Sequence, residues 1–331
     1  MSKQIGIVRI GVTTVAAATF LLSWSSGFVV PAIATVDVSP LTLLVWRFVP
    51  LAAVLVAIVV CTGAARGVAR ADVRRQSLIG LFAQFGYCTA VYAAIAEGVA
   101  TGTTALIDAV QPLVVAMLVG PLLGVRVRGA QWIGLAVGAV GVLLVVRSQL
   151  DDSTAHPAAY LWPVLAMACL IVGTFLQRRS APRTGVLVTL TIHATVTAVV
   201  LVPIAAIFGA LAPPASAAFW LAVGFAAALP TLAAYGLYWW LLRRVGITAL
   251  NALLFLVAPT TAAAGALMLG EPLTIVTLIG FVCCGAGVAT VLTSEARATP
   301  LPTPRVAVPP RPHRAPTSVG GTTAAHGSSP A

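Results

Sequence analysis

Residues 41–61 read LTLLVWRFVPLAAVLVAIVVC, an apolar run that is interrupted by one charged side chain, Arg47. A run of about 20 apolar residues is long enough to cross the hydrocarbon core of a bilayer as an α-helix. A guanidinium group is costly inside that core unless it is paired or reaches water. Either this segment does not lie in a membrane, or Arg47 faces something other than lipid.

The composition of the whole chain settles the first alternative. Of its 331 residues, 60% are hydrophobic and only 8% are charged, whereas a soluble domain carries about 25% charged residues. The apolar runs have the length of helices rather than of barrel strands. We therefore expect an all-α integral membrane protein in a lipid bilayer, with ten transmembrane helices as two inverted five-helix repeats. The expected spans lie near residues 10–33, 41–61, 77–97, 102–122, 129–147, 158–177, 186–208, 218–241, 249–269 and 273–293.

The charged residues predict the orientation of these spans. With a cytoplasmic N-terminus, 17 of the 19 lysines and arginines fall on the cytoplasmic side, and the exceptions are Arg47 and Arg147. The opposite side holds most of the acidic residues: Asp37, Glu97, Asp151, Asp152 and Glu271. The positive-inside rule then predicts a multi-pass protein with both termini in the cytoplasm. It also accounts for the net charge of +11 without a nucleic-acid partner. The single lysine among so many arginines suggests a GC-rich bacterial genome, and hence a bacterial inner (plasma) membrane.

The sequence repeats itself after 146–147 residues. ALIDAVQPLVVAMLVGPLLG at 105–124 resembles ALLFLVAPTTAAAGALMLG at 252–270, and WIGLAVGAVGVLL at 132–144 resembles LIGFVCCGAGVAT at 278–290. The same offset pairs Gly27 with Gly173, Tyr92 with Tyr238, and Arg47 with His193. Five spans per copy is an odd number, so the second copy should be inverted in the membrane, as in many secondary transporters.

These repeats predict the domain organisation. Residues 1–150 form the first repeat and residues 151–293 the second. Residues 294–331 contain eight prolines and no apolar run, which is typical of a disordered tail.

The repeated pattern of a proline within a span, then GEPL, then a glycine-spaced span resembles the drug/metabolite transporter superfamily, EamA type. The resemblance covers residues from about 17 to 293. It implies a ten-helix fold with a central cavity, and export or exchange of a small organic solute such as an amino acid, a metabolite or a drug. The first copy departs from the pattern, because it has Gly124-Val125-Arg126 where the second has Gly270-Glu271-Pro272.

Arg47 and Asp108 are the first candidates for a substrate pathway. Each lies several residues into a span that starts at the outer face, so both should lie at about the same depth. An ion pair between them, direct or through water, would place them in the outer part of the pathway. Alternatively, the pair only holds two helices together, Arg47 extends toward the membrane surface, or the two never meet.

The remaining candidates are polar or aromatic residues within spans. His193 is the counterpart of Arg47 and has either a proton-linked role or a structural hydrogen bond to a neighbouring helix. Pro112 and Pro259 each remove a backbone hydrogen bond, so they are hinge candidates or static kinks. Further candidates for the pathway are Tyr92, Tyr238, Trp24, Ser25 and Gln84, and the alternative for Trp24 and Ser25 is close helix packing.

Other classes of function have little support in the sequence. We find no Walker A loop, no HExxH motif and no nucleophile elbow, and the five cysteines lack metal-ligand spacing. We therefore expect no cofactor, no metal and no enzymatic activity. A secondary exporter of a small organic solute working by alternating access fits best. A membrane receptor or assembly protein without solute flux is the alternative, supported only by the tail. Proton coupling and facilitated diffusion both remain open, and no feature indicates an oligomeric state.

Overall fold

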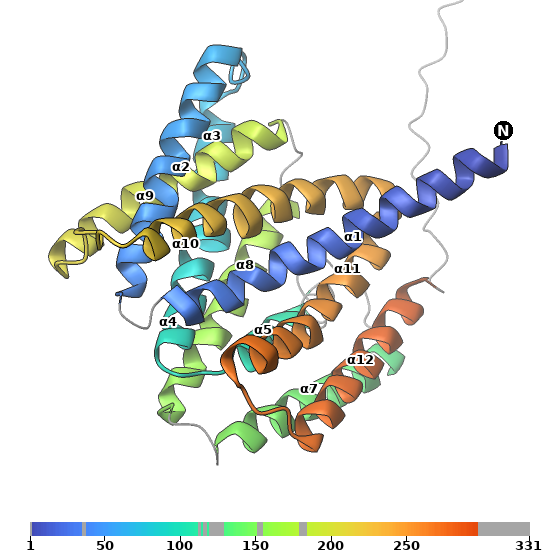
Figure 1. Cartoon of the computed structure of the whole chain (residues 1–331). Helices are drawn as coiled ribbons and strands as arrows, with labels where there is room; N and C mark the ends of the chain where they lie inside the picture. Colours follow the sequence, from blue (N-terminus) through green and yellow to red (C-terminus); the bar gives the residue numbers. More distant parts are fainter. Residues whose placement is uncertain are drawn as a thin grey trace, which may run out of the picture. The chain divides into compact units, whose positions relative to one another are not determined.

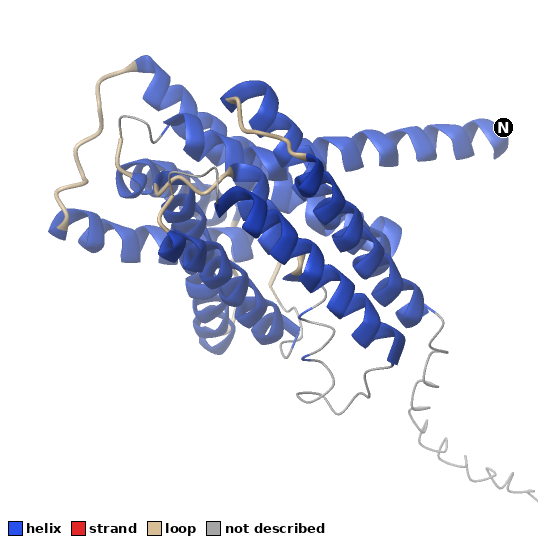
Figure 2. Cartoon of the chain, turned by 90° about the horizontal axis from the view of Figure 1, so that it is seen from below, coloured by secondary structure: helices blue, strands red, loops and turns tan. Residues whose placement is uncertain are grey.

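The computed structural model describes residues 2–34, 38–111, 129–150, 155–178 and 184–296, together with the isolated positions 114 and 118. This part of the chain contains helices and no strand (Figure 2). The expected disordered tail falls almost wholly outside the described residues, because only its first three positions are described, as the end of the last helix. The hinge candidate Pro112 also lies outside them.

Most helices follow the predicted spans, but only the first part of the span expected over 102–122 lies within the described residues, as α5. The α-helices are α1 (Ser2–Ala34), α2 (Pro40–Thr62), α3 (Arg70–Gly80), α4 (Tyr87–Ala96), α5 (Thr101–Ala109), α7 (Gly129–Leu150), α8 (Leu161–Arg178), α9 (Val186–Ile207), α10 (Ala217–Ala227), α11 (Ala234–Leu269) and α12 (Ile275–Ala296). Three further segments have other helical geometries: the π-helices η1 (Leu81–Gly86) and η3 (Ala228–Ala233), and the 3₁₀-helix η2 (Pro157–Tyr160).

The lengths and composition of these helices fit a multi-pass membrane protein. Within the described residues, six helices are long and apolar enough to cross a membrane, and three shorter apolar helices accompany them. The six begin at Gly11, Pro40, Arg70, Pro157, Val186 and Ala217. The expectation of an all-helical membrane protein is confirmed, because the described residues form helices joined by loops and carry this many apolar helices, whereas the number of ten spans stays a prediction.

Local sequence explains where α2 begins and ends. The Ser39 side chain accepts a hydrogen bond from the backbone N–H of Leu41, and Pro40 occupies a first-turn position, where its missing N–H costs nothing. At the other end Gly63 adopts φ 66°, a left-handed conformation that glycine adopts without strain. These two signals place Arg47 in the second turn of the helix.

The helix α11 covers the end of the span expected over 218–241 and the whole of the span expected over 249–269. It is a single helix of 36 residues, with no interruption at the expected loop around Arg243 and Arg244. A straight helix could not make both of the contacts that α11 makes with neighbouring residues of α1, however. The ring of Trp24 lies 5.6 Å from that of Tyr235, while the adjacent Ser25 donates to the carbonyl of Val257. These partners are separated by 22 positions, which is about 33 Å along a straight helix. The chain must therefore turn back within α11 (Figure 1), so this range comprises two helical arms rather than one straight span.

Helix packing is matched between the two halves of the chain. The α7–α12 pair makes the most extensive contact, and the two helices run side by side in Figure 1. Glycines permit this close approach, because a Cβ added at Gly141 would lie 2.7 Å from the sulfur of Cys284. The offset of 146–147 residues relates α7 to α12 and α2 to α9, and each helix packs on its own counterpart. The same offset relates α3 to α10. Accordingly, α3 packs on α9 in the same way as α10 packs on α2.

The two π-helical segments occupy equivalent positions in the two halves. Residues 81–86 and 228–233 are related by an offset of 147. Each segment packs against the first helix of the other half: η3 against α1, and η1 against α8. A Cβ added at Gly27 would lie 3.2 Å from the Cβ of Pro230, and one added at its counterpart Gly173 would lie 2.6 Å from the Cβ of Ala83. Such segments are rare and frequently mark functional sites, so they direct attention to the space between them.

Candidate functional site

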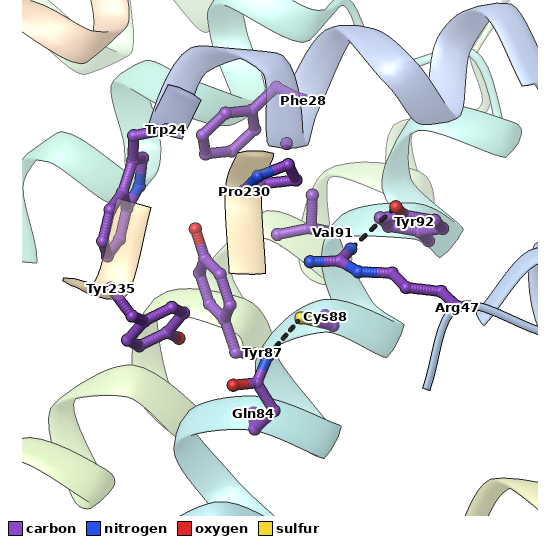
Figure 3. A pocket seen from close by; sticks show the side chains of 11 residues that line it. Trp24, Phe28, Arg47, Gln84, Tyr87, Cys88, Val91, Tyr92, Pro230 and Tyr235 are labelled. Carbon is purple, nitrogen blue, oxygen red and sulfur yellow. Dashed lines mark hydrogen bonds between the residues drawn. The ribbon is translucent and has the colours of Figure 1, made fainter. Parts of the chain in front are cut away.

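A small pocket, with a cavity volume of about 30 Å³ and partly open to its surroundings, is lined by residues from both π-helical segments (Figure 3). Gln84 of η1 and Pro230 of η3 contribute to its wall, and α1, α2, α4 and α11 supply the rest. Most of the lining is aromatic or apolar, and Arg47 is the one charged residue among the described residues that line it. The lining residues are Trp24, Gly27, Phe28, Arg47, Gln84, Tyr87, Cys88, Val91, Tyr92, Pro230 and Tyr235.

Arg47 is held in place by hydroxyl groups. Its Nη1 donates to the hydroxyl of Tyr92 at 2.8 Å. Its Nε and Nη2 both donate to the hydroxyl oxygen of Thr231, at 3.2 and 2.8 Å. The guanidinium carbon also lies 4.9 Å from the ring centroid of Phe48 and 5.6 Å from that of Tyr92, within the range of a cation–π interaction. Only 3% of Arg47 is exposed, so the side chain does not extend to the membrane surface.

Pro230 explains why Thr231 is available to Arg47. Proline has no backbone N–H, so it cannot donate to the carbonyl four residues earlier in a helix. That carbonyl belongs to Ala226, and it accepts a hydrogen bond from the hydroxyl of Thr231 at 3.0 Å. The hydroxyl proton is thereby used, and the oxygen lone pairs point to the guanidinium. A missing backbone donor in one half of the chain therefore orients a charged side chain from the other half.

Asp108 makes no direct ion pair with Arg47, which was one of the alternatives that their equal depth left open. One of its carboxylate oxygens, Oδ2, accepts a hydrogen bond from the hydroxyl of Tyr87 at 3.0 Å. The other oxygen, Oδ1, is buried and has no hydrogen-bond partner among the described residues. Tyr87 lies between the pocket and Asp108, because it lines the pocket that contains Arg47 and its hydroxyl donates to Asp108. Equal depth along two helices fixes height in the membrane, but it does not fix the direction in which each side chain points.

His193 lies away from this pocket and takes part in a separate polar chain. Its Nε2 is 3.1 Å from Oε1 of Gln76, and Nε2 of Gln76 is in turn 3.3 Å from Oε1 of Gln177. The chain connects α9, α3 and α8, and His193 is 8% exposed. A proton-linked role stays a prediction, whereas the alternative of a hydrogen bond to a neighbouring helix agrees with the observed geometry.

The other predicted residues divide into those that line the pocket and those that do not. Trp24, Gln84 and Tyr92 line it. Ser25 and Tyr238 do not: Ser25 binds the Val257 carbonyl, and the ring of Tyr238 lies 6.2 Å from that of Trp24. The hinge candidate Pro259 lies inside α11, where its role as a hinge stays a prediction.

The glutamate of GEPL has a structural role in the second copy. The helix α5 begins without a side-chain cap of its own. Glu271 supplies one from the α11–α12 connection: Oε1 accepts from the backbone N–H of Thr101 at 2.8 Å, and Oε2 accepts from the Thr101 hydroxyl at 2.9 Å. A carboxylate at a helix N-terminus is stabilised by the free N–H groups and the helix dipole. The first copy has Val125 at the equivalent position, which cannot accept such bonds.

Several pocket residues were not identified as pathway candidates from the sequence. Cys88 was interpreted only as a packing residue, yet it lines the pocket and accepts a hydrogen bond from Gln84 at 3.4 Å. Phe28 and Val91 carried no signal at all. Thr231 did carry one, because Pro230 and Thr231 stand together inside an apolar span and such a pair leaves both a carbonyl and a hydroxyl free to interact. Among the residues that the structure describes, no three His, Cys, Asp or Glu side chains gather as a metal site would require.

Comparison with known proteins agrees with this architecture. A family model, the EamA-like transporter family, matches residues 10–147 and 157–293, which confirms the resemblance inferred from the repeated sequence pattern. Comparison with curated proteins gave no match. Among solved structures 25 chains match. One of them, described as "Crystal structure of protein", has a TM-score of 0.59 and 21% sequence identity, and the alignment covers 87% of this chain and 99% of that one. At this identity the similarity shows the fold alone.

Proposed function

The chain belongs to the EamA-like transporter family, a family of membrane transporters of small solutes, and from that premise we propose that it exports a small organic solute through the pocket around Arg47. The two halves of the chain, 1–150 and 151–293, form inverted five-helix repeats. Their relative movement opens the pocket alternately to the two sides of a bacterial inner membrane. Family membership and the many apolar helices make it a multi-pass membrane protein rather than a soluble one.

The observation that carries this proposal is the pocket itself. Its wall combines residues from both repeats, since Pro230 and Tyr235 face Arg47 and Tyr92 across it. Secondary transporters built from two repeats bind their substrates at the interface between the repeats. A buried guanidinium in such a position is costly to maintain, which supports a role in binding solute rather than in packing alone.

The matched packing of the two halves supports alternating access. The pairs Gly27–Pro230 and Gly173–Ala83 are equivalent contacts under the repeat offset, and each joins the first helix of one half to a π-helical segment of the other. Two arrangements of similar energy are expected when two equivalent halves pack on each other in this way. The pocket lies on one of these contacts, so a movement there would change its access.

The test is flux through the pocket. Purified full-length protein is reconstituted into liposomes loaded with a labelled panel of amino acids, organic acids, amines and sugars, and release is measured. Val91→Trp fills the pocket and should abolish release of whichever solute is carried. Val54→Trp is the matched control, because it makes the same exchange in an apolar helix, α2, at a side chain that is 56% exposed. Thermal unfolding of both variants establishes that they are folded. If Val91→Trp is folded and releases solute as fast as wild type, the pocket is not the route.

Direction and orientation need a second measurement. Cys61 is an exposed thiol at the end of α2, which the charge distribution puts on the cytoplasmic side. A maleimide that cannot cross membranes should label Cys61 only after cells are permeabilised, with Cys61→Ser as the control. Labelling in intact cells would reverse the proposed orientation. Export itself predicts that overexpressing cells lose the carried solute to the medium faster than cells with an empty vector.

A further inference from the structure

We propose that the solute is an organic monoanion, and that Arg47 binds its acidic group while the aromatic wall binds a flat apolar body. This inference rests on the proposed function, and it specifies the chemical class that the same pocket accepts. Three features of the described residues support it: the unused donors of Arg47, the lack of an acidic partner, and the composition of the rest of the wall.

The first feature is the count of donors. A guanidinium group carries five N–H donors, and Arg47 uses three of them, one each on Nε, Nη1 and Nη2. One N–H on each terminal nitrogen is therefore left without a partner in the described protein. Figure 3 shows the guanidinium directed into the space beside Tyr87, Val91 and Pro230. Two N–H groups on neighbouring nitrogens match the two oxygens of a carboxylate or sulfonate, which guanidinium groups bind in a bidentate way.

The second feature is the uncompensated charge. Both hydrogen-bond partners of Arg47 are neutral hydroxyl groups, and among the described residues no carboxylate pairs with it. Asp108, the acidic residue that the sequence suggested as a partner of Arg47, accepts a hydrogen bond from Tyr87 instead. Leaving a buried charge without an opposite charge is unfavourable. A bound anion removes that cost, whereas a cationic solute would add a second positive charge to the same small space.

The third feature is the remaining wall. Trp24, Phe28 and Tyr235 present rings, and Val91 presents an aliphatic side chain. The only other polar lining groups are Gln84, Cys88 and the tyrosine hydroxyls, of which the Tyr92 hydroxyl is already used by Arg47. A solute with several hydroxyl groups or with two negative charges would leave most of its polar groups unpaired here, at a cost. One acidic group on a flat apolar body fits the wall best.

Two permanently charged probes of similar size test this inference. Labelled benzenesulfonate and labelled phenyltrimethylammonium are loaded into separate liposomes that contain the wild-type protein, and release is measured against protein-free liposomes. We expect release of benzenesulfonate to be at least about ten-fold faster than that of the cation, the ratio that corresponds to about 1.4 kcal/mol. Arg47→Gln should remove the preference, while Arg66→Gln, an exposed arginine in a loop, should leave it unchanged.

A binding measurement keeps the test decisive if Arg47→Gln does not fold or if no probe is released. Benzenesulfonate should raise the unfolding temperature of the solubilised wild-type protein and phenyltrimethylammonium should not, because only the anion binds the folded pocket. Equal effects of the two probes, or faster release of the cation, would overturn the inference. If the protein releases other solutes through the pocket but neither binds nor releases benzenesulfonate, the inference fails while the transport function stands. If none of the labelled amino acids, organic acids, amines and sugars is released, the transport function itself fails.

Discussion

Thr231→Val tests whether the position of Arg47 depends on a single hydroxyl group from the other half of the chain. Valine has nearly the same shape as threonine, so the change removes the hydroxyl without creating a large cavity. It removes the acceptor for Nε and Nη2 of Arg47 and the donor to the Ala226 carbonyl. Thr231 is 2% exposed, so water cannot readily replace either interaction.

The magnitude follows from these contacts. A hydrogen bond to a charged group contributes about 1.5–3 kcal/mol, and a buried group left without a partner costs about 1–3 kcal/mol. Because both N–H groups share one oxygen atom, we count them as one charged hydrogen bond and add the lower value for the Ala226 carbonyl. The free energy of unfolding should fall by about 3 kcal/mol. For a chain of this size that corresponds to a decrease of about 4 °C in Tm.

The assay is thermal unfolding of purified protein in detergent, with wild type, Thr231→Val and two controls. Thr231→Ser keeps the hydroxyl and should unfold within about 2 °C of wild type, a difference of about 1 kcal/mol. Thr19→Val removes a hydroxyl that binds only a carbonyl of its own exposed helical turn, so its Tm should also be nearly unchanged. If Thr231→Val unfolds together with Thr19→Val, the hydroxyl does not hold the guanidinium and the account of the site is wrong.

Three further predictions concern other contacts. Glu271→Ala removes the cap of α5 and should lower the free energy of unfolding by about 1–2 kcal/mol, measured as a shift in Tm; an unchanged Tm would mean that the cap is not stabilising. Gly173→Ala places a Cβ 2.6 Å from that of its neighbour and should destabilise by about 1–3 kcal/mol, whereas Gly224→Ala meets nothing within 4 Å and should be neutral or stabilising. Gln76→Leu deprives His193 of its partner and should cost about 1–3 kcal/mol; adding His193→Phe should recover part of that loss, and a strictly additive double variant would contradict the pairing.

Much of the fold could be predicted, because the length of each apolar run and the turn residues beside it determine where most helices begin and end. The expected span 41–61 became a helix over Pro40–Thr62 that ends at Gly63, and the expected span 186–208 became Val186–Ile207. The bounds of α11 were not predictable, because hydropathy reports the depth of a residue and not where helical geometry begins or ends. The π-helical segment over 81–86 leaves no compositional signal either, since one additional residue in a turn changes no residue type.

The sequence predicted several of the residues that line the pocket, but it did not predict which residues they contact. Buried polar and aromatic residues in apolar spans are few, so Arg47, Tyr92 and Trp24 could be identified from the sequence. Their partners could not, because a position along a helix fixes the height of a side chain and leaves its direction to the packing of neighbours. Asp108 shows this most clearly: its depth matched that of Arg47, yet it binds Tyr87. The partner of Arg47, Thr231, comes from a segment whose geometry depends on Pro230.

The dependence of Arg47 on Pro230 and Thr231 constrains any redesign of the pocket. Exchanging the arginine alone for a neutral residue would strand a hydroxyl oxygen that the distant helix still presents, and replacing the proline alone would return the Ala226 carbonyl to the regular helical ladder. An engineer who wishes to change the charge of the accepted solute therefore has to vary three positions on two helices together. A library that varies these three positions together would therefore reach pockets that single substitutions do not.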